Sequence, residues 1–247
     1  MAIPRIIHLC WFGNGKATSK IERCLKTVHR LEPRYEIRTW NESNYDVTKS
    51  PLVADAYNRK RWSLVSNYVR LDVLKRHGGI YLDTDIEVVK PFDELLDREF
   101  FIGFMWDCNL GTAVIGAVPE HPIVNGILWT YDNVAGSYRS PNNDTFTEYF
   151  LEHVPGFRLN GKAQRLNDGV EVFDKYAFEH PSWLKRRNYS IHHFEQSWKS
   201  PSKIKAVAKK AVVQYGSLWL YRKYICYKSL RISPFYQTYA QELARGR

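Results

Sequence analysis

The residues best suited to chemistry are two aspartates, Asp83 and Asp85, which directly follow the apolar residues 80–82. In an extended chain, residues two apart point to the same side, so both carboxylates are expected on one face at the end of a strand. Two carboxylates this close repel each other unless a proton or a cation lies between them. Because oxygen ligands favour a hard ion, the spacing predicts a site for Mn²⁺ or Mg²⁺.

A predicted helix over residues 62–77 precedes this strand and adds a second set of polar groups. Ser63, Asn67 and Arg70 are spaced i, i+4 and i+7, so they share one side of the helix. An arginine beside an amide suits a phosphorylated or polyhydroxylated ligand. The helix is expected to end at Gly78-Gly79, because glycine accepts the left-handed conformation, and the chain then turns straight into the strand.

The elements that must position these residues alternate between strand and helix along the first 120 residues. This alternation predicts an α/β fold with a mainly parallel sheet, in which ligands bind at the carboxyl ends of the strands. Residues 141–169 are rich in loop-forming residues and are expected to form an active-site flap. The expected strands are residues 5–12, 35–40, 80–83, 100–106 and 112–118, and a further helix is expected over residues 19–31.

The charge divides the chain into two parts. The net charge is +10, and residues 199–247 hold eleven basic residues against one acidic residue, so residues 1–198 are neutral. We therefore expect a catalytic domain over residues 1–198 and a basic amphipathic helical segment over residues 199–247. Such a segment suits an anionic membrane surface, and packing of the same helix on the body is the alternative.

The remaining composition limits the compartment. Hydrophobic residues make up 44% of the 247 residues, which excludes a disordered chain, and no apolar run approaches the roughly 20 residues that cross a bilayer. The four cysteines are scattered without a C-x-x-C pair, so we expect free thiols in a reducing compartment. The start carries no apolar signal-peptide region. These features predict a cytoplasmic protein, with peripheral attachment to the inner face of the cytoplasmic membrane through the basic segment.

Three stretches together resemble glycosyltransferase family 32. The most specific is Ser66-Asn67-Tyr68-x-Arg70 followed by Gly78-Gly79-Ile80-Tyr81-Leu82-Asp83-x-Asp85. Residues 3–13 are similar to the family's opening strand, and Ile191-His192-His193-Phe194-x-x-Ser197-Trp198 is similar to its closing motif. The family includes fungal α-mannosyltransferases and bacterial capsule or lipopolysaccharide sugar transferases, with the clostridial glucosylating toxins as more distant relatives.

The resemblance implies a GT-A fold (a Rossmann-like sheet flanked by helices), a UDP- or GDP-sugar donor, Mn²⁺ or Mg²⁺, and retention of the anomeric configuration. It implies these roles: Trp11 and Phe12 at the nucleotide; Asn67, Arg70 and Asp83 at the donor sugar or phosphate; Asp83, Asp85 and His193 at the metal; Ser197 and Trp198 at the diphosphate. Whether His192 or His193 faces the metal stays open. Relatives usually carry aspartate at the position of Asn67, so the sugar hydroxyls that this chain reads are expected to differ.

Asn109 follows a predicted strand, and we expect it to face the donor or the acceptor. The function expected on these grounds is a retaining glycosyltransferase that moves a hexose to a glycan or lipid-linked glycan during polysaccharide, lipopolysaccharide or capsule synthesis. Two alternatives are a basic nucleic-acid-binding protein and a non-catalytic sugar-binding protein on a transferase fold. Because the basic residues are confined to one end, no nucleic-acid partner is expected.

Overall fold

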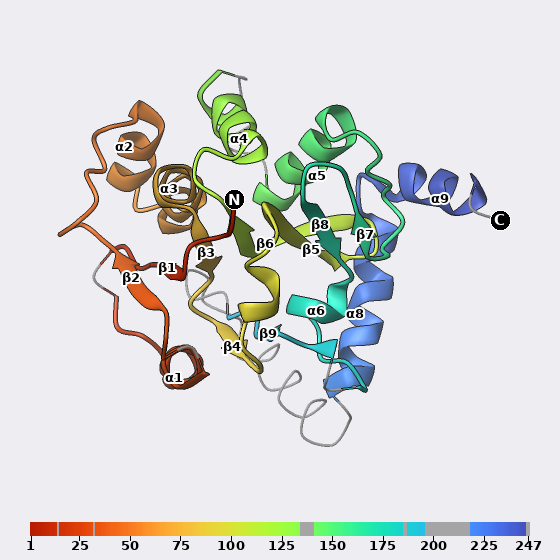
Figure 1. The fold of residues 1–247 in the computed structure, drawn as a ribbon, viewed down its shortest axis with the longest axis horizontal. Coiled ribbons are helices and arrows are strands. Elements are labelled where there is room, and N and C mark those ends of the chain that lie inside the picture. Colours follow the sequence, from red (N-terminus) through yellow and green to blue (C-terminus); the bar gives the residue numbers. More distant parts are fainter. Residues whose placement is uncertain (14, 32, 134–140, 185–186, 196–217, 246–247) are drawn as a thin grey trace.

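The computed structural model describes the whole chain except residues 14, 32, 134–140, 185–186, 196–217 and 246–247. Its centre is a seven-stranded sheet with the order β2-β1-β3-β6-β5-β8-β7 (Figure 1). Only β6 and β7 run against the other five strands of this sheet, which confirms the mainly parallel arrangement. The strands are β1 (Ile6–Cys10), β2 (Glu36–Trp40), β3 (Gly79–Leu82), β5 (Phe100–Trp106), β6 (Asn109–Ala117), β7 (Gln164–Arg165) and β8 (Val170–Phe173).

Helices cover both faces of this sheet (Figure 1). Helices α2, α3, α4 and α5 lie along one face, whereas α1, α6 and a small second sheet lie along the other. The bounds are α1 (Ser19–Leu31), α2 (Pro51–Asn58), α3 (Trp62–His77), α4 (Pro122–Asn133), α5 (Asn142–His153) and α6 (Lys175–Phe178), with a short 3₁₀ helix at Asp93–Leu95. The helices predicted over residues 19–31 and 62–77 therefore have the expected bounds.

The hydrophobic core has two parts, one on each face of the sheet, because side chains alternate along a strand. On β3, Tyr81 packs into the core under α3 and α4, whereas Ile80 and Leu82 pack into the core under α1 and α6. All three side chains are almost fully buried. Strand β3 is therefore fixed on both faces, and the residues that follow it start from a rigid position.

The second sheet joins two distant parts of the chain. It pairs β4 (Ile86–Val88) with β9 (Ser190–His192) in antiparallel register, with Ile86 opposite His192. Since β4 begins one residue after Asp85, this pairing brings the predicted histidine motif beside the predicted aspartates.

The described part of the C-terminal segment packs on the body. It forms α8 (Leu218–Ile232) and α9 (Tyr236–Arg245), and α8 contacts β5 (Figure 1). Cys226 and Phe235 are buried, and Phe235 belongs to the core cluster that includes α3 and α4. The expected domain boundary at residue 198 lies outside the described residues. No helix of the described chain combines the length and apolar character needed to cross a membrane.

The prediction of a loop-rich flap over residues 141–169 is wrong for its first half. Helix α5 begins after Pro141 and buries Phe146 and Phe150, which lie four residues apart on one face. The helix packs against β6. The polar run Asn142-Asn143-Asp144 at its start is typical of a loop, and the burial of the two phenylalanines outweighs that local preference.

Candidate active site

A cavity of about 990 Å³ opens at the edge of the sheet where β1 and β3 end and β6 begins. Its size suits a small-molecule ligand. Most of the residues singled out in the sequence lie along it: Trp11, Phe12, Ser63, Asn67, Arg70, Asp83, Asp85, Asn109 and His192. The end of α8 and the turn that follows it also contribute to the wall, through Ser229, Ile232, Ser233 and Pro234.

Arg70 is a buried cation that holds Asp83 in place. Its Nη2 lies 3.2 Å from Asp83 Oδ1 and donates to Asn67 Oδ1 at 3.1 Å, while its Nη1 donates to the Thr112 carbonyl at 2.6 Å. The Tyr81 hydroxyl donates to the same Asp83 oxygen at 2.7 Å, and the guanidinium lies over the Tyr81 ring. The structure thus brings the helix residues Asn67 and Arg70 to the first aspartate, as the spacing predicts.

Asp85 is held by the chain segment that follows β9. The Glu195 backbone N–H donates to Asp85 Oδ2 at 2.7 Å, and the His193 backbone N–H donates to the Asp85 carbonyl at 3.1 Å. Phe194, between them, has a φ of 52°, a left-handed conformation that a bulky residue rarely adopts. This strained residue directs the Glu195 N–H onto the carboxylate, so the loop is shaped around Asp85.

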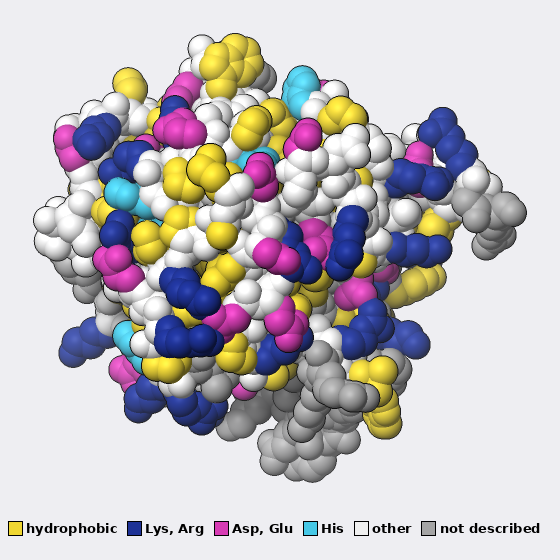
Figure 2. All heavy atoms as spheres, viewed as in Figure 1, with side chains coloured by type: hydrophobic (Ala, Val, Ile, Leu, Met, Phe, Trp, Pro, Cys, Tyr) yellow, Lys and Arg dark blue, Asp and Glu magenta, His cyan; other side chains and the backbone are white. Residues whose placement is uncertain are grey.

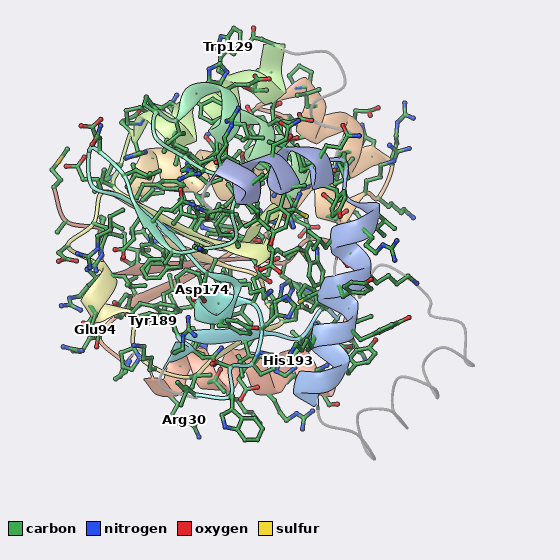
Figure 3. All side chains as sticks on the ribbon, turned by 90° about the vertical axis from the view of Figure 1, so that its right-hand side faces the viewer. Arg30, Glu94, Trp129, Asp174, Tyr189 and His193 are labelled. Carbon is green, nitrogen blue, oxygen red and sulfur yellow. The ribbon has the colours of Figure 1, made fainter. Side chains whose placement is uncertain are left out.

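His192, not His193, lies beside the two aspartates. Asp83, Asp85 and His192 each offer a ligand atom, and these atoms lie within 4.8 Å of one another. His192 Nε2 is 3.3 Å from Asp85 Oδ1. His193, labelled in Figure 3, instead places its Nε2 2.7 Å from Glu87 Oε2. Successive side chains of a strand point to opposite faces, so the β4–β9 pairing selects one histidine of the two.

The charges around this cluster favour a cation at its centre. Burial alone lowers the pKa of His192, but Glu179 and Asp85 on either side raise that pKa to about 10. Burial likewise tends to raise the pKa of Asp85, but His192 and the Glu195 N–H outweigh it and lower the pKa. Two carboxylates and one imidazole nitrogen form a donor set that accepts Mn²⁺ or Mg²⁺, so the residues present fit the predicted ion.

A network of amides and hydroxyls forms another part of the cavity wall. Asn109 donates to Asp144 Oδ1 at 2.8 Å, and Thr112 donates to Asn143 Oδ1 at 2.7 Å. Asn142 in turn donates to Thr112 Oγ1 at 2.9 Å. These groups join the start of β6 to the start of α5, and the carbonyl of Thr112 also binds Arg70. The wall can therefore exchange several hydrogen bonds with a polyhydroxylated ligand.

Trp11, which is predicted to contact the nucleotide, lines the cavity together with Phe12 and Trp62. Trp11 is partly exposed, and its Nε1 donates to the Gly15 carbonyl at 2.8 Å. Phe12 is buried and packs edge-on against Tyr45, so it supports the wall from the core side. Trp62 also lines the cavity, and its ring lies so close to Gly13 that any side chain at that position would collide with it. The predicted Ser197 and Trp198 lie outside the described residues.

Sequence reasoning missed three contributions to this cavity. Glu179 lies next to His192, and no local motif marks it. Asn143 and Asp144 belong to a segment interpreted as loop. Trp62 begins the helix that carries Arg70, and its position one residue before Ser63 is the signal that could have drawn attention to it.

The chain is similar to known sugar transferases in sequence. Residues 18–102 match the family described as "Glycosyltransferase sugar-binding region containing DXD motif". An uncharacterized glycosyltransferase of Acanthamoeba polyphaga mimivirus is 28% identical over 193 residues, covering 72% of this chain and 73% of the viral protein. Inositol phosphoceramide mannosyltransferase 3 of Schizosaccharomyces pombe is 26% identical over 144 residues, covering 57% of this chain and 40% of the yeast protein.

The fold is similar to that of a solved structure, the PaToxG glycosyltransferase. The two superimpose with a TM-score of 0.51 at 19% identity, over 63% of this chain and 70% of the other. The sequence matches confirm the predicted resemblance to Asp-x-Asp sugar transferases, and the structural match confirms the GT-A fold.

Proposed function

We propose that this chain, which carries the DXD region of the sugar transferases and their GT-A fold, is a metal-assisted glycosyltransferase. It transfers a hexose from a nucleotide-sugar donor to a glycan acceptor. The observation that carries the proposal is the cluster of Asp83, Asp85 and His192 in a cavity beside the buried Arg70. A carboxylate pair with an imidazole provides a metal site, and the adjoining wall of amides and hydroxyls provides donors and acceptors for a sugar.

In this proposal Asp85 and His192 hold the divalent cation directly, and Asp83 contributes directly or through water. A divalent cation bound there supplies positive charge against the negative charge that grows on a departing nucleoside diphosphate. Arg70 adds a fixed positive charge, and its four hydrogen-bond partners prevent it from moving. Ser197 and Trp198 are proposed to contact the diphosphate, on the resemblance alone.

The donor is proposed to span the cavity from the nucleotide to the sugar. Trp11 stacks on the base, and Phe12 supports this part of the cavity wall from the core side. Asn67, Asn109 and the residues that start α5 read the sugar hydroxyls. An amide at Asn67 both donates and accepts, so it suits a hydroxyl pattern different from one read by aspartate. Retention of configuration is proposed from the resemblance to the retaining family.

A nucleotide-release assay tests the proposal. A panel of UDP- and GDP-sugars is incubated with the wild-type chain, with Mn²⁺ or with chelator, and with the variant Asp85→Asn. The matched control is Asp168→Asn, an exposed turn residue that stands away from the cavity. We expect metal-dependent release from one donor, lost by at least about 100-fold in Asp85→Asn and unchanged in the control.

The other outcomes of the same assay are informative. Equal activity of Asp85→Asn and wild type contradicts the metal assignment. Donor binding without release, even with a glycan panel as acceptors, supports the alternative of a non-catalytic sugar-binding protein. Absence of both metal-dependent binding and release contradicts the transferase proposal as a whole.

The acceptor is proposed to be a growing glycan or lipid-linked glycan of polysaccharide, lipopolysaccharide or capsule synthesis, reached from the cytoplasmic face of a membrane. The support is the outer face of α8, where Lys223, Tyr224, Tyr227, Lys228 and Arg231 are exposed. Basic and aromatic side chains together suit an anionic lipid surface. Co-sedimentation with phosphatidylglycerol vesicles checks this: Lys223→Glu with Lys228→Glu should reduce binding, and unchanged binding contradicts the membrane role.

A further inference from the structure

Glu179 is a buried carboxylate that holds His192 through two bonds. It follows α6 directly, and its side chain is 2% exposed. Its Oε2 lies 2.7 Å from His192 Nδ1, and its backbone carbonyl accepts the His192 N–H at 3.2 Å. Both the ring and the backbone of His192 are therefore fixed by one residue from a different part of the chain.

We infer that Glu179 is a positioning residue: it holds the proton of His192 on Nδ1 and turns Nε2 toward Asp83 and Asp85, and so sets the affinity of this centre for a divalent cation. The inference rests on the metal centre of the proposed function. It adds a residue that neither the sequence motif nor the resemblance marks.

The packing around Glu179 and His192 restricts the positions that the carboxylate and the imidazole ring can take. A Cβ at Gly111 of β6 would lie 2.3 Å from Glu179 Oε1, so the strand carries a glycine where the carboxylate lies. Phe194 stacks on the His192 ring with centroids 4.0 Å apart, and the Arg222 guanidinium lies over Phe194. Stacking fixes the plane of the imidazole, but it does not decide which nitrogen faces the aspartates. The Glu179 carboxylate supplies that choice.

The chemistry of metal-binding histidines gives the expected size of the effect. An imidazole that binds a metal through one nitrogen usually donates its other N–H to a carboxylate, and loss of that acceptor typically costs 10–100-fold in metal affinity. Ligation through Nε2 requires that Nε2 carry no proton. A cation that binds at Nε2 displaces the proton from that nitrogen, and the ring keeps its proton on Nδ1, where the Glu179 carboxylate accepts it.

Titration of the purified full chain with MnCl₂ by calorimetry tests the inference. We expect Glu179→Ala to bind Mn²⁺ roughly 10–100-fold more weakly than wild type. Glu179→Gln, which still accepts a hydrogen bond but lacks the charge, should fall between the two. The matched control is Glu87→Gln, because Glu87 makes a contact of the same length with the neighbouring His193. The control should bind Mn²⁺ as wild type does.

A second readout separates positioning from general stability. In a chain with ¹⁵N-labelled histidines and saturating Zn²⁺ as a diamagnetic substitute, the His192 Nδ1 proton should exchange slowly with water in wild type, because Glu179 accepts it, and much faster in Glu179→Ala. A structural role alone would change the thermal midpoint without changing the exchange rate of the Nδ1 proton. If Glu179→Ala fails to fold, Glu179→Gln decides the question with the same two measurements.

The outcomes distinguish this inference from the proposed function. Normal Mn²⁺ binding by Glu179→Ala, or an equal loss in Glu87→Gln, overturns the inference and leaves the metal centre standing. A wild-type chain that binds no Mn²⁺ overturns the metal centre and, with it, the role assigned to Glu179. Weaker Mn²⁺ binding in both Glu179 variants, together with faster exchange of the His192 Nδ1 proton, supports both.

Discussion

Arg70 combines a full charge with almost complete burial, and its guanidinium joins Asp83 to Asn67 and to the Thr112 carbonyl. Lysine in its place keeps the charge but cannot bind the Thr112 carbonyl, Asn67 and Asp83 in one planar fork. We expect Arg70→Lys to lower nucleotide release about 100-fold, equivalent to about 2.7 kcal/mol in the activation barrier. Steady-state rates with the preferred donor measure this.

Arg76→Lys is the matched control for that experiment. Arg76 lies on the same helix and pairs with Asp72 at the surface, away from the cavity. Its replacement should leave the rate within about twofold, since surface pairs contribute at most about 1 kcal/mol. Similar losses in the two variants would mean that helix α3, not the Arg70 fork, limits activity.

His8 makes the stability of the chain depend on pH. Its Nδ1 accepts from Trp40 Nε1 at 3.0 Å and its Nε2 donates to the Gly78 carbonyl, so the ring is held neutral. Burial lowers the pKa of His8 from 6.5 to about 4. Between these values the unfolded chain binds more protons than the folded chain, so stability falls as the pH decreases.

The variant His8→Asn should remove this contribution, because asparagine offers a donor and an acceptor without titrating. Between pH 7 and pH 5 wild type should lose about 2 kcal/mol more than the variant in the free energy of unfolding. Urea unfolding at both pH values measures the difference. Parallel losses in the two proteins would assign the pH dependence to other groups.

The sequence predicts that Arg70 and Asp83 lie close together, because one helix, one turn and one strand connect them and their spacing fixes their geometry. It could not choose between His192 and His193, because that choice depends on the register of β9 against a strand from a distant part of the chain. The role of Glu179 could not be predicted from the sequence for the same reason. Its role exists through a contact between elements and leaves no local pattern.

At the scale of elements, β6 must run past Glu179 without a side chain at Gly111. We expect Gly111→Ala to displace the Glu179 carboxylate, because the new Cβ would lie 2.3 Å from Oε1. Calorimetric titration should show Mn²⁺ binding weakened by at least about tenfold in a chain that still folds. This variant disturbs Glu179 without altering its chemistry.

Gly15→Ala provides the comparison for that variant, since a Cβ at Gly15 meets nothing within 4 Å. It should bind Mn²⁺ like wild type. Unchanged binding in Gly111→Ala as well would show that the carboxylate has room to move and that β6 does not set its position.

Elements were predictable where local pattern and burial agree. The helix over residues 62–77 has a clear glycine stop, and β3 is buried on both faces, so both appear where expected. Helix α5 was missed because its first residues favour a turn, while its stability comes from Phe146 and Phe150 against the body. Packing that depends on a distant partner cannot be deduced from a short window of sequence.

At the scale of the whole molecule, the C-terminal segment contributes to the body as well as to the surface. Phe235 is 7% exposed within the main core cluster. We expect Phe235→Ala to lower the free energy of unfolding by about 3 kcal/mol, as for other large-to-small changes in a core. The exposed neighbour Tyr236 should tolerate alanine within about 0.5 kcal/mol. Equal small effects would mean that α9 is only loosely attached.

The surface charge agrees with the division of the chain into a neutral body and a basic C-terminal segment. Basic and acidic side chains are interspersed over the face shown in Figure 2, in agreement with the balanced charge of residues 1–198. The distribution of charged residues along the sequence therefore predicted that the surface of residues 1–198 carries mixed charges. It did not predict that Arg222, one of the basic residues of the tail, turns inward and donates to the His192 carbonyl at 2.8 Å.

The β4–β9 pairing has a consequence for folding during translation. The ribosome delivers the chain from its N-terminus, so Asp83 and Asp85 emerge well before His192, and Arg222 emerges later still. A nascent chain can fold β1 and β3 and yet hold two adjacent carboxylates without their histidine. The cluster of Asp83, Asp85 and His192 therefore forms only after residue 192 has been synthesised, and a chain that terminates before that residue lacks the imidazole.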